Sequence, residues 1–103
     1  MAQARAQTHF VYIVRCANGA LYTGYSTDVE KRVATHNAGK GSRYTRSHLP
    51  VTLCASWSFQ RKGDARRSER AIKRLSRARK VWLIEQALHG EAWSLTMEGA
   101  DQE

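Results

Sequence analysis

Two tyrosines lie ten residues apart around a predicted turn, where their phenol groups could act together in proton transfer. Residues 9–26 read HFVYIVRCANGALYTGYS, in which two runs rich in Val, Ile, Tyr, Leu and Thr flank an Asn-Gly pair, as in a β-hairpin. A two-residue turn would place Tyr12 and Tyr22 on opposite faces, because side chains alternate along a strand. A three-residue turn with Gly19 in the left-handed conformation would pair Tyr12 with Gly24 and place both phenols on one face. Gly24 would then leave room for the Tyr12 ring.

A second pair of reactive side chains follows on a predicted helix. Thr27 and Glu30 have the spacing of a capping box, so we expect a helix over residues 28–38. Arg32 and His36 lie one turn apart on this helix and could contact a common target. They also fit a plainer interpretation, an exposed arginine and a histidine that interacts with the helix dipole.

Residues 38–50 combine two glycines, three bases and an aromatic side chain. Such a loop could surround a phosphate while Tyr44 stacks on a base or bonds a phosphate oxygen. It lacks the glycine and lysine spacing of a P-loop, and an ordinary connecting loop fits the composition equally well. The side chains expected to contact nucleic acid here are Lys40, Arg43, Tyr44 and Arg46.

A lone acid stands among bases on a later predicted helix, which Asp64 can cap and which we expect over residues 64–77. Glu69 lies at the edge of the apolar stripe of this helix. A salt bridge with Lys73, worth only about 0.3 kcal/mol, would explain the acid without any functional role.

The remaining elements complete the predicted fold. Residues 51–60 alternate apolar and polar side chains, which predicts a half-buried strand, and a third helix is expected over residues 79–89. The apolar positions of this strand are Val51, Leu53, Ala55, Trp57 and Phe59. The order strand, strand, helix, strand, helix, helix predicts an α/β (α+β) sandwich with a three-stranded antiparallel sheet flanked by helices.

The charge distribution favours nucleic acid as the partner. The chain of 103 residues has a net charge of +8, and all 17 Lys and Arg residues lie before residue 81. A basic body attracts polyanions, although a solvated surface that only aids solubility is the alternative. An isoelectric point of about 10.1 in so small a domain favours nucleic acid.

The rest of the composition restricts the class of protein. No apolar run approaches the ~20 residues that span a bilayer, and the N-terminus lacks a signal-peptide core, so we expect a cytoplasmic protein. Cys16 and Cys54 have no zinc-site spacing, and we expect both to be reduced. We divide the chain into a disordered N-terminus at 1–8, one domain at 9–89 and an acidic tail at 90–103.

The hairpin sequence resembles that of a known family. Residues 10–12, Phe-Val-Tyr, followed ten residues later by residues 22–24, Tyr-Thr-Gly, are similar to the paired motif that names the GIY-YIG nucleases. Phe10 and Val11 replace the Gly and Ile of the first motif, and Thr23 replaces the Ile of the second. The resemblance continues through Arg32, His36, Asn37, Tyr44 and Thr45, and the size and layout resemble the small stand-alone bacterial members of the family.

This resemblance implies a nuclease with one Mg²⁺ or Mn²⁺ ion held by Glu69. Arg32 would hold the scissile phosphate, and Tyr12, Tyr22 and His36 would order or deprotonate the attacking water. A phenolate at pH 7 costs roughly 4 kcal/mol, so a tyrosine base predicts an alkaline optimum. A rate that is flat from about pH 6 to 9 would favour His36 as the base.

The implied activity is endonucleolytic hydrolysis of DNA, more than of RNA, structure-selective or weakly specific, with a place in DNA repair or recombination. The competing hypothesis is a module that binds nucleic acid through the same basic face without cleaving it. The other basic side chains expected on that face are Arg66, Arg70, Lys73 and Arg74. The sequence does not set the oligomeric state.

Overall fold

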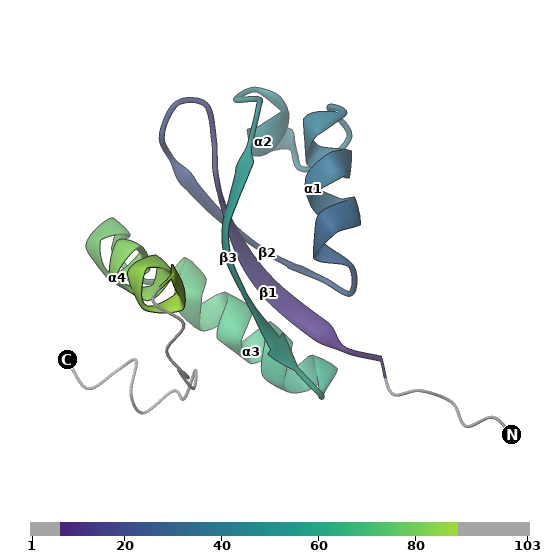
Figure 1. Cartoon of the computed structure of the whole chain (residues 1–103), viewed down its shortest axis with the longest axis vertical. Helices are drawn as coiled ribbons and strands as arrows, with labels where there is room; N and C mark the ends of the chain where they lie inside the picture. The colour runs from purple at the N-terminus through teal and green to yellow at the C-terminus, as the bar shows by residue number, and fades with distance from the viewer. Residues whose placement is uncertain (1–6, 89–103) are drawn as a thin grey trace, which may run out of the picture.

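The computed structural model describes residues 7–88, which form a three-stranded antiparallel sheet with helices on both faces (Figure 1). The sheet has the order β2-β1-β3, so β1 is central and the other two strands are edges. The elements in chain order are β1 (His9–Arg15), β2 (Leu21–Ser26), α1 (Val29–Asn37), α2 (Arg43–Arg46), β3 (Thr52–Phe59), α3 (Lys62–Lys73) and α4 (Arg77–Leu88). The predicted fold class and order of elements are confirmed, with the short helix α2 added inside the predicted loop.

The hairpin has the three-residue turn. Tyr12 pairs with Gly24, and Tyr22, two positions before Gly24, therefore lies on the same face as Tyr12. Gly19 has a φ angle of 88°, and its amide donates to the Cys16 carbonyl at 2.8 Å. A left-handed residue is easiest for glycine, which explains why the turn ends there.

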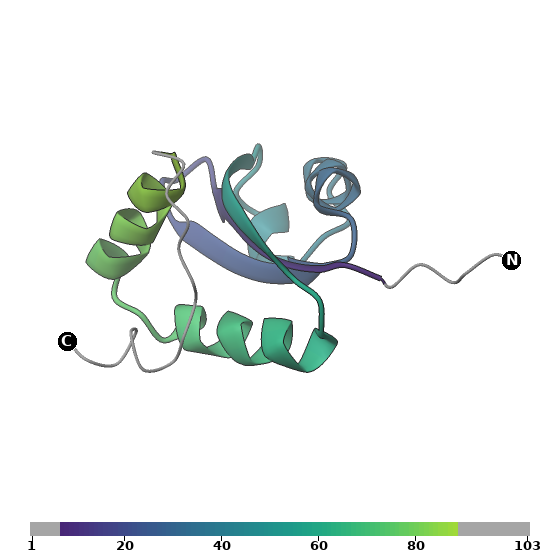
Figure 2. The same ribbon diagram turned by 60° about the horizontal axis from the view of Figure 1, so that its bottom comes forward.

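One face of the sheet carries the larger hydrophobic core. Val11 and Ile13 of β1 pack with Ala65 and Ile72 of α3 and with Leu83 of α4, and all five are at most 3% exposed. In Figure 2, α3 runs beneath the sheet on this side. The apolar stripe of the helix thus faces the sheet as the sequence predicts, and it fixes the orientation of the rest of α3.

The opposite face carries a smaller core in which one aromatic side chain belongs to the hairpin pair. Tyr12, Val14, Cys16 and Val51 are buried there, and the partly buried Tyr22, Val29, Val33 and Leu49 pack around them. Helix α1 covers this face (Figure 2), and Tyr12 and Tyr22 belong to the same cluster as Val29 and Val33 of that helix.

A bulge in β3 changes the predicted alternation. Ile13 pairs with Ala55 but Val14 pairs with Leu53, which leaves Cys54 as an extra residue. Leu53 is therefore 41% exposed on the face opposite to Ala55. The prediction that the two share the buried face was wrong, because alternation holds only while the register is unbroken.

Helix α1 begins with a different cap from the predicted one. Oδ1 of Asp28 accepts from the amide of Lys31 at 3.1 Å, so Asp28 is the N-cap. The Ser26 hydroxyl bonds the Asp28 amide at 2.9 Å, which helps hold Asp28 in the extended conformation that a cap needs. The predicted capping box of Thr27 and Glu30 was wrong by one residue for this reason.

The last two helices are divided differently from the prediction. Helix α3 starts two residues before Asp64, which lies in the first turn and pairs with Arg67 instead of capping the helix. The Ser76 hydroxyl accepts from the amide of Arg79 at 3.2 Å. Ser76 thus caps α4, which begins at Arg77, whereas α3 ends at Lys73. The prediction that one helix continues from residue 64 to residue 77 was therefore wrong.

Some predicted features lie outside the described residues, namely the helix end at residue 89, the tail at 90–103 and most of the segment 1–8. Within residues 7–88, none of the helices combines the length and apolar character that a bilayer crossing requires.

Thr23 provides a test of the hairpin packing. Its hydroxyl is buried, with the residue 3% exposed, and it has no hydrogen-bond partner among residues 7–88. An unpaired buried hydroxyl costs free energy, so Thr23→Val, which keeps the shape, should raise the free energy of unfolding by about 1 kcal/mol. Urea denaturation measures this change, and a loss of stability would show that the hydroxyl is satisfied in solution.

Candidate functional site

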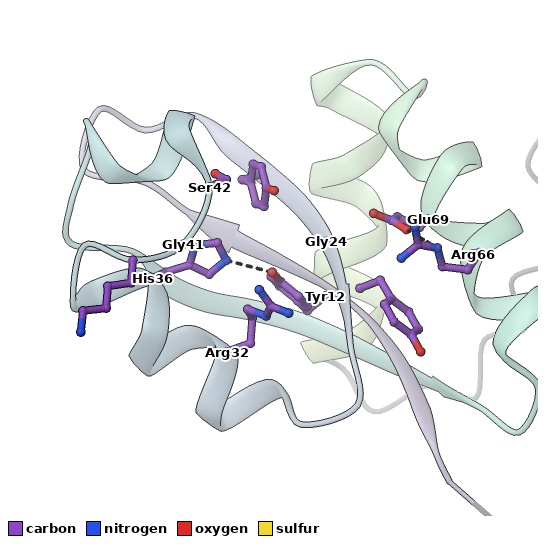
Figure 3. A pocket seen from close by; sticks show the side chains of 11 residues that line it. Tyr12, Gly24, Arg32, His36, Gly41, Ser42, Arg66 and Glu69 are labelled. Atoms are coloured by element: carbon purple, nitrogen blue, oxygen red, sulfur yellow. Dashed lines mark hydrogen bonds and ion pairs between the residues drawn. The ribbon is translucent and has the colours of Figure 1, made fainter.

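A cleft of about 240 Å³ lies along the β2 edge of the sheet (Figure 3). Its lining includes all five side chains for which the sequence predicts a catalytic or metal-binding role: Tyr12, Tyr22, Arg32, His36 and Glu69. The other lining residues are Gly24, Tyr25, Lys40, Gly41, Ser42 and Arg66.

The position of β2 explains how residues from both faces of the sheet meet. Tyr12 and Tyr22 belong to the face covered by α1, whereas Glu69 belongs to α3 on the other face. Since β2 is an edge strand, side chains from both sides can reach past it into one space. A central strand in the position of β2 would have separated them.

The imidazole of His36 is the most constrained side chain in the cleft. It is 1% exposed, with Nε2 2.9 Å from Oη of Tyr12 and Nδ1 2.8 Å from Oγ1 of Thr45. When the Thr45 hydroxyl donates its single proton to the Ser42 carbonyl at 3.2 Å, it accepts from Nδ1–H of His36. In that tautomer Nε2 accepts from the Tyr12 hydroxyl.

Burial sets the protonation state of this pair. It lowers the pKa of His36 below its usual value, and the Arg32 guanidinium lowers it further. Burial also raises the pKa of the Tyr12 phenol, with Tyr22 adding to the rise and Arg32 opposing it. At neutral pH the phenol and the imidazole are therefore both neutral.

Two glycines make the space for these rings. A Cβ on Gly24 would overlap the Tyr12 hydroxyl and lie 2.9 Å from Cε2 of that ring. A Cβ on Gly41 would overlap Nδ1 of His36 and lie 2.8 Å from Cε1. Gly24 has the role that the sequence predicts, and Gly41 holds the second ring in the same way.

Tyr22 and Arg32 complete the side of the cleft next to α1. The Tyr22 ring lies 5.5 Å from the His36 ring at 72°, so the imidazole contacts both tyrosines edge-on. Arg32 is exposed at the cleft, and its charge acts on the pKa values of both His36 and Tyr12.

Glu69 is nearly buried and paired with two cations of its own helix. The residue is 8% exposed, with Oε1 3.6 Å from Nε of Arg66 and Oε2 3.1 Å from Nζ of Lys73. The plainer alternative, a salt bridge with Lys73, is thus present in the structure. The carboxylate nevertheless lines the cleft that holds the tyrosines.

The basic side chains expected to contact nucleic acid are divided between the cleft and the surface outside it. Lys40 and Arg66 line the cleft, on the sides of α1 and α3 respectively. Tyr44 lies outside it, 44% exposed, and its hydroxyl accepts from Nδ2 of Asn18 at 3.1 Å. The others outside the cleft lining are Arg43, Arg46, Arg70, Lys73 and Arg74, all exposed.

Comparison with known proteins decides the family. The model of the GIY-YIG catalytic domain matches residues 8–81. The chain belongs to the GIY-YIG family, a nuclease superfamily. The predicted resemblance is thereby confirmed.

Relatives of similar size share this domain. The chain is 56% identical over 76 residues to a UPF0213 protein of Halobacterium salinarum, covering 74% of this chain and 99% of that protein. It is 51% identical over 78 residues to a UPF0213 protein of Staphylococcus haemolyticus, covering 76% and 95% of the two chains.

Two solved structures have the same fold. The solution NMR structure of the UPF0213 protein BH0048 from Bacillus halodurans is 43% identical, with a TM-score of 0.51 over 88% of this chain and 95% of that one. The NMR structure of the protein EF2693 from E. faecalis is 32% identical, with a TM-score of 0.57 over 84% and 92%. These neighbours confirm the three-stranded fold.

The residues of this GIY-YIG domain fit a magnesium-type ion better than a softer metal. Among residues 7–88, no group of three or more His, Cys, Asp and Glu side chains could enclose a metal. The cleft instead offers one carboxylate, Glu69, together with phenol oxygens and open space. Magnesium commonly keeps several waters and takes one or two carboxylates plus substrate phosphate, so this donor set suits it.

Residues around His36 to which the sequence pattern assigned no role are Gly41, Ser42 and Thr45, although Thr45 is part of the family resemblance. Thr45 is fully buried, and its amide donates to the Ser42 hydroxyl at 3.1 Å, which caps α2. Serine is a favoured N-cap residue, so Ser42 was the available sequence signal for this short helix. The contact of Gly41 with His36 depends on tertiary packing and left no local signal.

Asn37 joins helix α1 of the GIY-YIG domain to the start of β3. Its side-chain Oδ1 accepts from the Val51 amide at 2.7 Å, and its Nδ2 donates to the Val51 carbonyl at 3.0 Å. Asn37 therefore bonds both backbone groups of one residue, as a neighbouring strand would.

The close packing around His36 is tested by substituting two glycines, one in contact with the ring and one away from it. Gly41→Ala should lower the free energy of unfolding by about 1–3 kcal/mol, because the added methyl group overlaps the buried imidazole. Gly63→Ala is the control, since its Cβ meets only Arg67 at 3.6 Å and it lies inside α3, where alanine should add up to about 1 kcal/mol. Thermal unfolding compares the two, and equal stabilities would contradict the close contact at Gly41.

Proposed function

We propose that this protein is a divalent-metal-dependent endonuclease that hydrolyses phosphodiester bonds in DNA. The observation that carries the proposal is the cleft at the β2 edge, where a buried Tyr12–His36 pair faces Arg32 and Glu69. Hydrolysis of a phosphodiester needs an acceptor for the proton of water, cations for the equatorial oxygens and help for the leaving alkoxide. The lining supplies side chains suited to the first two.

The Tyr12–His36 pair is the proposed proton acceptor. As water attacks phosphorus, its proton passes to Oη of Tyr12 while the phenol proton passes to Nε2 of His36. The imidazole ends as an imidazolium and the phenol is neutral again, so no free phenolate is required. In this scheme the Thr45 hydroxyl accepts from Nδ1–H of His36, which leaves Nε2 unprotonated before the reaction.

Cationic side chains from two sides hold the scissile phosphate. Arg32 lies on α1 and Arg66 on α3, and both line the cleft together with Lys40. A guanidinium binds phosphate oxygens in a bidentate manner, which stabilises the charge that develops on them. Tyr22, whose ring contacts His36, orders the attacking water in this scheme.

Glu69 is the residue that would hold the metal ion. When bound, a Mg²⁺ or Mn²⁺ ion supplies Lewis-acid stabilisation of the phosphate and the leaving oxygen. Arg66 and Lys73 neutralise the Glu69 carboxylate within the chain, so its negative charge is tolerated in a nearly buried position.

The exposed bases outside the cleft give the proposed DNA affinity. Arg43 and Arg46 lie on α2, Arg70 lies on α3 and Arg74 directly follows it, so they extend the basic surface on either side of the cleft. Phosphate contacts of this kind position DNA without reading its sequence. We therefore propose structure-selective or weakly specific cleavage, which would suit DNA repair or recombination.

The role of Glu69 is tested on nicked, flapped, branched and single-stranded DNA with Mg²⁺ or Mn²⁺. Glu69→Ala should lower the cleavage rate by about 10²-fold or more, because metal stabilisation of the transition state is lost. Glu85→Ala is the control, since it also removes a carboxylate, but from an exposed position on α4. Equal cleavage by both variants would overturn the metal assignment, and binding without cleavage of every substrate would favour the non-catalytic module.

The proton acceptor is tested by the pH dependence of single-turnover cleavage. Since the pKa of His36 is lowered below about 6.5, the neutral imidazole is present throughout the neutral range. The rate should be flat from about pH 7 to 9 and fall tenfold per pH unit in acid, once His36 is protonated. A phenolate base would give the alkaline optimum expected from the sequence, because the pKa of Tyr12 is raised. A rate that keeps rising beyond about pH 9 would support that alternative and remove His36 as the acceptor.

A further inference from the structure

A second aromatic cluster lies on the other side of β2 from the Tyr12–His36 pair. Nδ1 of His9 lies 2.7 Å from Oη of Tyr25, and the two rings stack at 5.9 Å with an angle of 17° between them. Tyr25 pairs with Val11 in the sheet, so its side chain shares the face that α3 covers. Tyr25 also lines the cleft.

The guanidinium of Arg66 lies over the face of the Tyr25 ring. Cζ of Arg66 lies 4.8 Å from the centre of the Tyr25 ring, whereas Nζ of Lys62 lies at 6.0 Å. The same Arg66 uses Nε to contact Glu69 at 3.6 Å. One arginine is thus held by an aromatic face and by a carboxylate, although its side chain is 48% exposed.

This arrangement leaves the terminal N–H donors of the guanidinium free to bind a ligand. The stacking contact uses the flat face of the group, whereas all five N–H donors point outward in its plane. Nε faces Glu69, and the terminal nitrogens of Arg66 make no hydrogen bond within residues 7–88. A long side chain that would otherwise sample many rotamers is therefore held at the cleft with unused donors.

We propose that Tyr25 is a positioning residue whose ring face keeps Arg66 at the cleft as a phosphate-binding guanidinium. Arg66 then acts from the α3 side while Arg32 acts from the α1 side. The preorganised donor pair binds one DNA phosphate with less loss of side-chain entropy than a free arginine would. This inference depends on the proposed function only in taking DNA as the ligand.

Binding of a short fluorescein-labelled DNA duplex in EDTA tests the proposal without any cleavage. Fluorescence anisotropy gives Kd over a series of NaCl concentrations for wild type, Arg66→Ala, Tyr25→Met and the double variant. Arg67→Ala is the matched control, because Arg67 lies next in α3 and pairs with Asp64 outside the cleft. Tyr25→Phe keeps the aromatic face and loses only the bond to His9.

Arg66→Ala should raise Kd about tenfold and reduce the slope of log Kd against log salt by about 0.9, the value for one lost phosphate contact. Tyr25→Met should reproduce most of this loss, and the double variant should bind no more weakly than Arg66→Ala alone. Tyr25→Phe should stay close to wild type, and Arg67→Ala should weaken binding less than Arg66→Ala does.

Additive losses in the double variant would overturn the proposal, because Tyr25 would then act independently of Arg66. Equal losses for Arg66→Ala and Arg67→Ala, or no binding by the wild type, would also overturn it. Thermal unfolding of every variant shows whether Tyr25→Met folds. If it does not fold, Tyr25→Phe becomes the test, and a tenfold rise in its Kd with unchanged stability would contradict a role of the aromatic face. The nuclease proposal stands or falls separately, on the cleavage assays with Glu69→Ala.

Discussion

The site depends on one buried imidazole that is hydrogen-bonded through both ring nitrogens. His36 would lose solvation without compensation if either Tyr12 or Thr45 were absent, because a buried polar group needs a partner. Each partner belongs to a different element, β1 in one case and α2 in the other. The hairpin, α1 and the short helix α2 are therefore tied together at the place where the chemistry is proposed to occur.

The second constraint is topological. The order β2-β1-β3 makes the second strand of the hairpin an edge, and the cleft lies along that edge. One wall carries the nearly buried tyrosine and histidine rings, and the other carries Glu69 and Arg66 from a helix on the opposite face. Side chains from both faces of the sheet thus line one cleft, so this small domain forms the cleft without a second domain.

Much of this arrangement could be predicted from the sequence where local rules apply. The Asn-Gly pair predicted the hairpin, the three-residue option for its turn has the register of Tyr12 and Gly24 that the structure shows, and helical spacing placed Arg32 and His36 together. The exposed position of Leu53 was missed because a bulge depends on the partner strand, and the contact of Gly41 with His36 joins segments without any periodic pattern. The predicted cap of α1 was wrong by one residue, since Ser26, Thr27 and Asp28 are adjacent polar side chains, and that of α3 by three, since its N-cap Arg61 makes no side-chain cap bond that a sequence pattern could mark.

The side-chain amide of Asn37 hydrogen-bonds both backbone groups of Val51. Asn37 directly follows His36, whose ring contacts both tyrosines. The end of α1 is thereby fastened to the sheet by two bonds that must break together if the helix is to move away. The backbone of the histidine wall is consequently held in place, and both walls carry long exposed cationic side chains, Arg32 and Lys40 on one and Arg66 on the other. Adjustment to substrates of different shape would therefore fall to these cationic side chains, while the geometry of proton transfer stays unchanged from one substrate to the next.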